Sequence, residues 1–172
     1  MKVKHDTLSE QYDFVDGEYI DKVKAKYAPG IGLFLIHFSS LEHALDLCIA
    51  DFLHGGSHHF GYLVIEGISL NSKIELFRKF FPKSFTNPKV FRKLSALVKH
   101  LHSVRIFRNY LAHANWSTLE NTGYVRTKVD EKDGEVIFKK VRITPEVLRA
   151  WINRVKKLEE QLSEFLESAE RA

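Results

Sequence analysis

Apolar residues recur every three or four positions between Ile31 and Leu53, and the face they share is broad. This spacing is typical of a helix that buries one side in a protein core. We therefore predict a buried helix over residues 31–53. The apolar positions that carry the pattern are Phe34, Phe38, Leu41, Leu45, Cys48, Ile49 and Phe52.

The same segment contains the polar residues His37, Glu42, His43 and Asp46. Burying such a group without a hydrogen-bond partner costs roughly 2–7 kcal/mol. We therefore expect polar partners for these side chains from other elements of the fold.

Prolines and capping residues predict where other helices begin and end. A short helix is expected over Asp16–Tyr27, because Pro29-Gly30 follows it and proline disrupts a helix interior. Ser72-Lys73-Ile74-Glu75 has the Ser-x-x-Glu form of a capping box. It predicts a helix that runs through Phe81 and stops at Pro82.

Two longer helices enclose a segment of different periodicity. Asn87 supplies an N-cap and Pro88 a first-turn proline for a helix that ends near His113. Thr144-Pro145 opens a last helix with a regular apolar stripe. Between these helices, the residues on either side of a turn-rich stretch at 130–134 alternate between apolar and polar. This alternation predicts a β-hairpin at about 122–143. The stripe of the last helix is Val147, Leu148, Trp151, Val155, Leu158, Leu162, Phe165 and Leu166.

Composition places the chain among globular proteins. Its 172 residues are 44% hydrophobic and 28% charged, which suits one domain with its own core. The longest apolar run, Ile31–Phe38, is far shorter than a bilayer span, and no segment has the order of a signal peptide. The only cysteine, Cys48, cannot form an internal disulfide. We expect a cytoplasmic protein that does not enter a membrane.

The formal net charge of +4 favours partners that carry phosphate. Lysines and arginines are dense between Lys73 and Arg105, so a basic surface next to the following segment is expected. His54, His58 and His59 are close in sequence, but Gly55-Gly56 separates them and no Cys or acidic ligand accompanies them. We interpret them as a solvated loop, before a short helix at Phe60–Glu66, and predict neither a metal nor a cofactor.

The last turns of the helix that ends near His113 hold the candidate functional residues. At about 100° per residue, His102, Asn109 and His113 fall within roughly 40° of one another, and Arg108 lies about 140° from His113. His113 stands at the helix C-terminus, where the helix dipole interacts favourably with a protonated imidazole. The alternative that spacing alone favours is a structural hydrogen bond between Asn109 and His113 that caps the helix.

The segment Arg108-Asn109-Tyr110-Leu111-Ala112-His113 resembles the Arg-x4-6-His motif of HEPN (higher eukaryotes and prokaryotes nucleotide-binding) domains, many of which carry an Asn after the Arg. Ser40-Leu41-Glu42, Lys73-Ile74-Glu75-Leu76 and Trp116 also fit the order of elements usual in that family. The resemblance covers roughly residues 30–116. The last helix fits less specifically.

This resemblance implies a mainly α fold, a single HEPN-like bundle of four or five helices over residues 1–172 with the hairpin inserted before the last helix. It implies a homodimer in which the motif helices face each other. In catalytic members of the family it further implies metal-independent cleavage of RNA, whereas many other members only bind.

Carried over to this sequence, the chemistry begins when the ribose 2′-hydroxyl attacks the adjacent phosphorus. His113 would act as general acid or base, Arg108 would hold the phosphoryl oxygens, and Asn109 would orient His113 or the phosphate. Glu42 and His102 could contribute secondarily. The alternative for each of these two is a structural role as the partner of a neighbouring polar group.

Two functions therefore stay open. The first is an RNA endonuclease of the toxin or defence type with a composite site at the dimer interface. The second is a catalytically silent HEPN module that binds RNA, a nucleotide or a protein partner. Some toxins of the family carry, two residues after the His, a Tyr that an antitoxin nucleotidyltransferase modifies. Asn115 stands at that position, so we do not expect this route of neutralisation, and another antitoxin protein remains a candidate partner.

Overall fold

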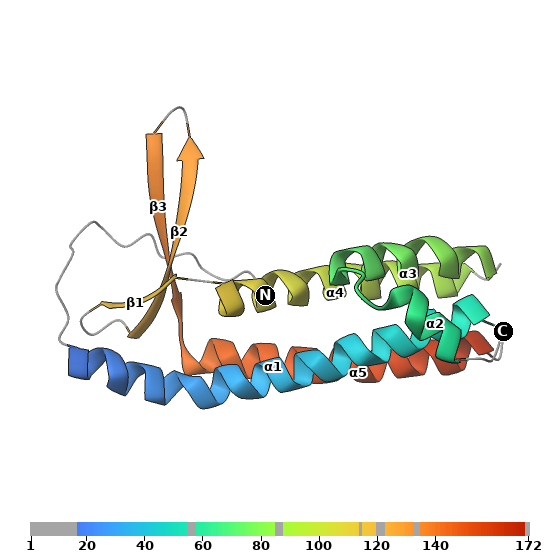
Figure 1. Cartoon of the computed structure of the whole chain (residues 1–172), viewed down its shortest axis with the longest axis horizontal. Helices are drawn as coiled ribbons and strands as arrows, with labels where there is room; N and C mark the ends of the chain where they lie inside the picture. The colour runs from blue at the N-terminus through green and yellow to red at the C-terminus, as the bar shows by residue number, and fades with distance from the viewer. Residues whose placement is uncertain are drawn as a thin grey trace. The chain divides into compact units, whose positions relative to one another are not determined.

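The computed structural model describes residues 17–54, 58–84, 88–113, 115–119, 123–132 and 135–170. Five helices and three strands follow one another in these residues (Figure 1). The described part of the chain is therefore mainly helical. In chain order the elements are α1 (Gly17–His54), α2 (His58–Ile65), α3 (Leu70–Ser84), α4 (Pro88–His113), β1 (Asn115–Leu119), β2 (Gly123–Lys132), β3 (Glu135–Ile143) and α5 (Pro145–Glu170).

Helix α1 is continuous for 38 residues, with Pro29 in its interior. The prediction of two helices separated by Pro29-Gly30 was therefore wrong. Proline removes one helical hydrogen bond, because it has no N–H to donate to the carbonyl of Ala25. Ala25 and Pro29 are both exposed, so water can satisfy that carbonyl and the helix can continue.

Helix α3 begins earlier and ends later than its sequence predicts. The backbone N–H of Ser72 donates to Oγ of Ser69 at 3.2 Å, so Ser69 is the N-cap and the predicted capping box at Ser72 was wrong. The helix also continues beyond Pro82 to Ser84. Glu75, the expected second member of the capping box, pairs instead with Arg78 and His102.

The two long C-terminal helices have the boundaries that their caps predict. Helix α4 begins at Pro88 and ends at His113, and Asn87, its expected N-cap, lies outside the described residues. At the start of α5, Oγ1 of Thr144 accepts a hydrogen bond from the backbone N–H of Val147 at 3.3 Å. Thr144 is thus the predicted cap of α5.

The sequence predicts one domain, and the residues group into two compact units. The first unit comprises Met1–Phe34 and Asn109–Trp151, and the second comprises Leu35–Arg108 and Ile152–Ala172. Within the first unit, α1 packs closely on the start of α5, since a Cβ built at Gly30 would lie 3.3 Å from Cδ1 of Leu148. Among the residues of this unit whose side chains the structure describes, the buried apolar ones are Val23, Tyr27, Phe34, Leu111, Ile143 and Leu148.

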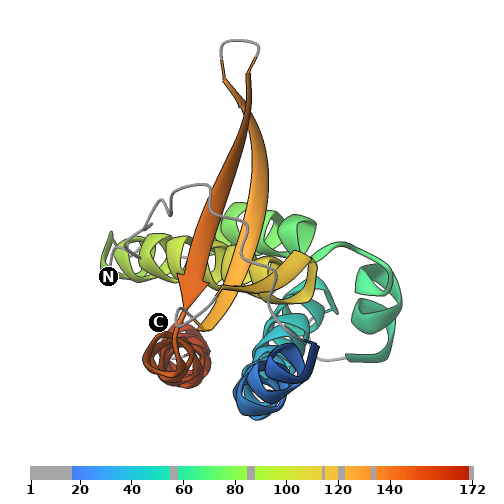
Figure 2. The ribbon, with the colours of Figure 1, turned by 90° about the vertical axis from the view of Figure 1, so that its left-hand side faces the viewer.

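The first unit also contains a three-stranded antiparallel sheet in the order β1-β2-β3. Strands β2 and β3 pair along their length, from Tyr124 opposite Ile143 to Lys132 opposite Glu135 (Figure 2). They occupy the segment where a hairpin is predicted, although residues 130–132, expected in the turn, belong to β2. Strand β1, which places Trp116 opposite Arg126, was not predicted.

The second unit is built from α2, α3 and the adjoining parts of α1, α4 and α5. The rings of Phe77 and Phe165 meet edge to face, with centroids 5.9 Å apart, so α3 contacts α5. Cys48 donates to the carbonyl of Ala44 at 2.8 Å, and burial raises the pKa of its thiol to about 12. All the apolar residues predicted for the buried face of α1 are buried except Phe52, which is half-buried.

Helix α2 lies against α1 at very short range. A Cβ built at Gly61 would come within 2.6 Å of the backbone of Ala50, so only glycine permits this approach. Gly67, with a φ of 77°, then allows the chain to turn between α2 and α3.

Residues 17–53 of α1 have the length and hydropathy of a membrane-crossing helix. A helix in the core of a soluble protein satisfies the same criteria, and several apolar residues of α1 contribute to the cores described above.

We predict that Gly61→Ala destabilises the protein by roughly 1–3 kcal/mol, because the added methyl group must push α2 away from Ala50. Gly32→Ala is the matched control. A Cβ at Gly32 meets nothing within 4 Å, so removing a helix glycine there should stabilise by about 0.5–1 kcal/mol. Urea unfolding followed by circular dichroism measures both changes. Equal effects of the two substitutions would contradict the close contact at Gly61.

Candidate functional site

The C-terminal turns of α4 carry Arg108, Asn109 and His113. His113 is the last residue of the helix and is exposed, whereas Arg108 and Asn109 are half-buried. Because the helix is continuous here, its 100° step sets their angular positions. Asn109 and His113 therefore lie on one face, and Arg108 is rotated by about 140° from His113.

Arg108 packs over an aromatic ring of α1. Its guanidinium carbon lies 5.8 Å from the ring centroid of Phe38, within the range of a cation–π contact. Phe38 is itself buried, so the contact holds the arginine side chain against the core of the second unit.

An apolar side chain accompanies the polar face of α4. Ile106 is 42% exposed, and its position on the helix is within about 60° of Asn109 and about 20° of His113. Isolated exposed apolar residues are common. This one matters because it stands beside the candidate site residues.

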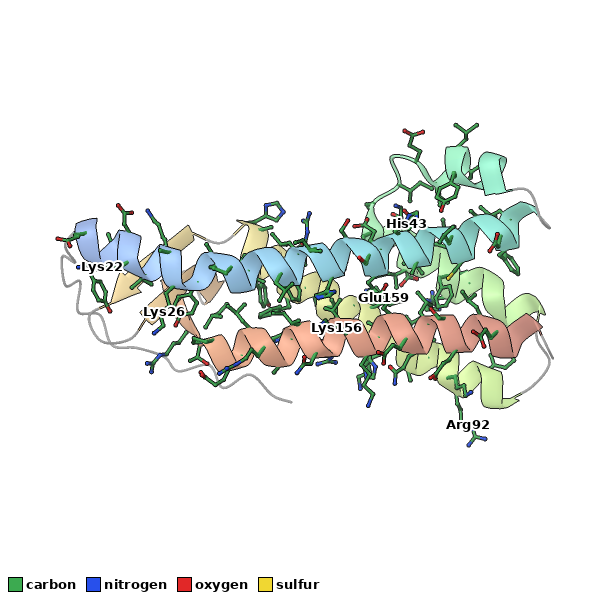
Figure 3. All side chains as sticks on the ribbon, turned by 90° about the horizontal axis from the view of Figure 1, so that it is seen from below. Lys22, Lys26, His43, Arg92, Lys156 and Glu159 are labelled. Carbon is green, nitrogen blue, oxygen red and sulfur yellow. The ribbon has the colours of Figure 1, made fainter. Side chains whose placement is uncertain are left out.

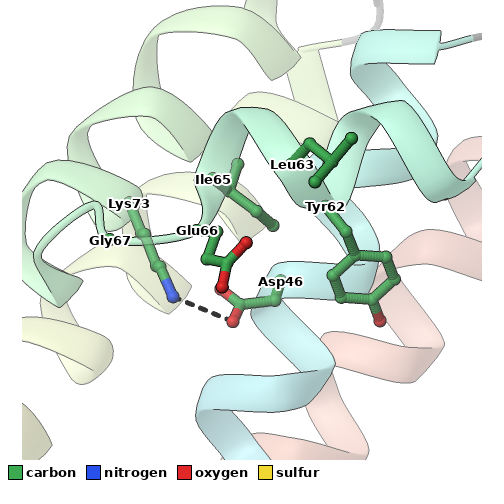
Figure 4. A pocket seen from close by; sticks show the side chains of 7 residues that line it. All are labelled: Asp46, Tyr62, Leu63, Ile65, Glu66, Gly67 and Lys73. Atoms are coloured by element: carbon green, nitrogen blue, oxygen red, sulfur yellow. Dashed lines mark hydrogen bonds and ion pairs between the residues drawn. The ribbon is translucent and has the colours of Figure 1, made fainter.

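Glu42 belongs to an ion-pair cluster between α1 and α3. Nζ of Lys73 lies 2.8 Å from Oδ2 of Asp46 (Figure 4). The same Nζ lies 3.8 Å from Oε1 of Glu42. The side chain of Lys73 is only 10% exposed. Two of the polar residues embedded in α1 thus share one buried cation as their partner.

His102 also has an ion-pair partner. Its Nε2 lies 3.4 Å from Oε1 of Glu75, and the other carboxylate oxygen of Glu75 is 2.8 Å from Arg78. The hydrogen bond from Arg78 and, to a lesser extent, that from His102 lower the pKa of Glu75. Glu42 and His102, the two secondary candidates, each therefore contact a structural partner.

The basic surface expected from the sequence is carried mainly by α4. Arg92, Lys93 and Lys99 are exposed, and Arg92 projects away from the helices (Figure 3). Lys73 and Arg78, in contrast, are paired with acidic side chains of the second unit. The exposed cations of α4 precede Arg108 along the same helix.

His100 lies among these cations. Burial lowers its pKa, and the positive charges of Arg154 and Lys99 lower it further. The contributions of Arg154 and Lys99 indicate a positive potential around His100 in the second unit.

No group of three potential metal-ligating side chains occurs in the described part of the chain. His54 is the last residue of α1, and His58 and His59 are the first two of α2, so the prediction that all three lie in a loop was wrong. Their side chains are outside what the structure describes.

Comparison with known proteins adds no relative. No protein-family model, curated protein or solved structure matches the chain. The functional argument therefore depends on the residues themselves.

Sequence reasoning placed Arg108, Asn109 and His113 on a helix end, where the structure has them. It recognised that Asp46 needs a partner but did not find Lys73. The two residues are 27 positions apart and on different helices, so no local spacing connects them. The only sign of this ion pair in the sequence was the acidic Asp46 within the apolar pattern of α1.

We predict that Lys73→Met destabilises the protein by about 3 kcal/mol, because it leaves the carboxylate of Asp46 largely buried without its cation. Lys79→Met, which removes an exposed lysine from the same helix, should have little effect. Glu42→Gln should be milder than Asp46→Asn, since Glu42 is the more distant and more exposed partner. Denaturant midpoints rank the four variants, and comparable losses in Lys73→Met and Lys79→Met would exclude a buried ion pair.

We also predict a pH effect from His100. Its folded-state pKa is below the usual value of 6.5, so the unfolded chain binds more protons near that pH. Stability should fall as the pH drops through about 6.5 and on to the lowered pKa. His100→Gln should flatten this part of the stability curve, which thermal unfolding between pH 5 and 8 would detect. Superimposable pH profiles for the two proteins would show that His100 contributes nothing.

Proposed function

We propose that the protein is a metal-independent endoribonuclease of the toxin or defence type. The observation that carries the proposal is the placement of Arg108, Asn109 and the exposed His113 within the last two turns of α4. Phosphodiester cleavage by an internal nucleophile needs proton transfer and stabilisation of negative charge, which a histidine and an arginine can supply, and an amide can orient either the histidine or the phosphate. The resemblance to the HEPN motif points in the same direction.

The reaction uses the ribose 2′-hydroxyl of the substrate as the nucleophile. Its oxygen forms a bond to the adjacent phosphorus as its proton is transferred to a base, and the bond to the 5′-oxygen breaks. That leaving oxygen takes up a proton and becomes a 5′-hydroxyl, and a 2′,3′-cyclic phosphate remains. His113 would transfer one of these protons, and Arg108 would stabilise the negative charge on the phosphoryl oxygens.

A single copy of α4 does not direct Arg108 and His113 to the same side. Their separation of about 140° around the helix favours a composite site in which two helices contribute different residues. Ile106, exposed beside His113, is the kind of residue that becomes buried when two such helices meet. We therefore propose a homodimer in which Arg108 of one subunit acts with His113 of the other.

We predict that the purified protein cleaves single-stranded RNA in excess EDTA and leaves DNA intact, because DNA lacks the 2′-hydroxyl. His113→Ala and Arg108→Ala should each lower the rate by roughly 10²–10⁴-fold. His37→Ala, which removes a half-buried histidine of α1, is the control for loss of an imidazole elsewhere. Gel assays of RNA cleavage, with detection of the cyclic phosphate, measure these outcomes.

Equal RNA degradation by the wild type and His113→Ala would assign the activity to a contaminant. The protein would then be a binding module. Loss of cleavage in EDTA would instead require a metal site, with His54, His58 and His59 as the first residues to mutate.

Mixing the two inactive variants tests the composite site directly. In a dimer of Arg108→Ala with His113→Ala, one of the two sites keeps both wild-type residues if they come from different subunits. Random mixing should therefore restore about a quarter of the wild-type rate, since half of the dimers are mixed. If both residues act within one subunit, the mixture stays inactive.

A further inference from the structure

An open cleft of about 540 Å³ lies between α1, α2 and the start of α3, all within the second unit. Figure 4 shows its lining, with Lys73 and Asp46 joined by their ion pair. Arg108, Asn109 and His113 do not line it. The residues that line the cleft are Asp46, Tyr62, Leu63, Ile65, Glu66, Gly67 and Lys73.

Negative charge exceeds positive charge at this cleft. Asp46 and Glu66 line it, and Glu42 stands next to Lys73, the only cation among the lining residues. Lys73 engages Oδ2 of Asp46, whereas the buried Oδ1 has no hydrogen-bond partner among the described residues. Because Oδ1 of Asp46 is buried, the carboxylate that the cleft offers to a ligand is that of the exposed Glu66, on a chain whose net charge is +4.

Tyr62 gives the cleft an aromatic wall. Its ring stacks on that of His43, with centroids 6.2 Å apart and an interplanar angle of 21°. Desolvation raises the pKa of the Tyr62 hydroxyl, and the negative charges of Asp46 and Asp51 raise it further. The negative potential of the acids thus reaches this wall, next to a π-face that also attracts cations.

The α2 side of the cleft presents an exposed apolar residue. Leu63, which lines the cleft, is 66% exposed, and the next residue of α2, Val64, is 60% exposed but does not line the cleft. Gly61 holds α2 tightly against Ala50, so these two side chains are presented on a fixed helix.

We propose that this cleft binds an arginine side chain of a partner polypeptide, with an apolar neighbour of that arginine resting on Leu63. Charge complementarity selects the occupant. A planar guanidinium offers several N–H donors to the exposed carboxylate of Glu66 and stacks on an aromatic ring such as that of Tyr62. RNA is disfavoured, because its phosphates would face Asp46 and Glu66. The cleft is separate from the residues of the proposed ribonuclease, so either assignment can fail without the other.

The test uses the full-length protein and a fluorescent eight-residue peptide that carries one central arginine between leucines. The matched probe replaces the arginine with citrulline, which is nearly isosteric and neutral. Fluorescence anisotropy should show at least about tenfold weaker binding of the citrulline peptide, corresponding to a lost charge-assisted contact. Amide NMR shifts on titration should be largest around Tyr62, Glu66 and Gly67.

Variants locate the contacts without disturbing the buried ion pair. Glu66→Gln and Leu63→Ser change exposed residues and should each weaken binding several-fold, whereas Glu160→Gln, an exposed acid of α5, should leave it unchanged. Equal binding of the arginine and citrulline peptides, or no binding at millimolar concentration, would overturn the proposal. Spermidine that binds more tightly than the peptide would also overturn it, in favour of a site for free polyamines.

Discussion

One buried ammonium group joins α3 to α1 in the second unit. Nζ of Lys73 reaches Asp46 and Glu42, two acids one helical turn apart on α1, from the first turns of a helix 27 residues later. Taking this cation out of water is tolerable only because both acids remain close to it. The same contact occupies Glu42, which limits the freedom of that side chain to act on a substrate, and it forms one wall of the acidic cleft.

Helix α4 imposes a second constraint, which concerns the directions in which the candidate catalytic side chains can point. Residues on a continuous helix cannot rotate relative to one another, so the angle between Arg108 and His113 is fixed by their spacing. A site that brings both side chains to one phosphate must therefore take one of them from a second molecule. This is why the proposed activity is tied to association, and why the exposed Ile106 is relevant to a catalytic argument.

Much of the helical pattern was predictable, because the apolar stripes of α1 and α5 encode burial directly and Thr144 caps α5 by a local hydrogen bond. The errors have physical causes. A helix can continue through a proline where water replaces the lost hydrogen bond, and Pro29 is exposed to water. Serine suits an N-cap at either Ser69 or Ser72, and in the structure Ser69 has that role. Lys73 and its acids could not be paired from the sequence, because their contact depends on the packing of separate helices. The ribonuclease site, the dimer and the cytoplasmic location stay predictions.

The buried thiol of Cys48 has a practical consequence. With a pKa of about 12, it is almost wholly protonated at neutral pH, and only the thiolate reacts readily with alkylating agents or disulfides. The chain has no other cysteine. A cysteine introduced on the surface would therefore be the sole reactive sulfur in the folded protein, so that spin labels, fluorophores or crosslinkers could be attached at a chosen position of the wild-type background without first removing a native residue.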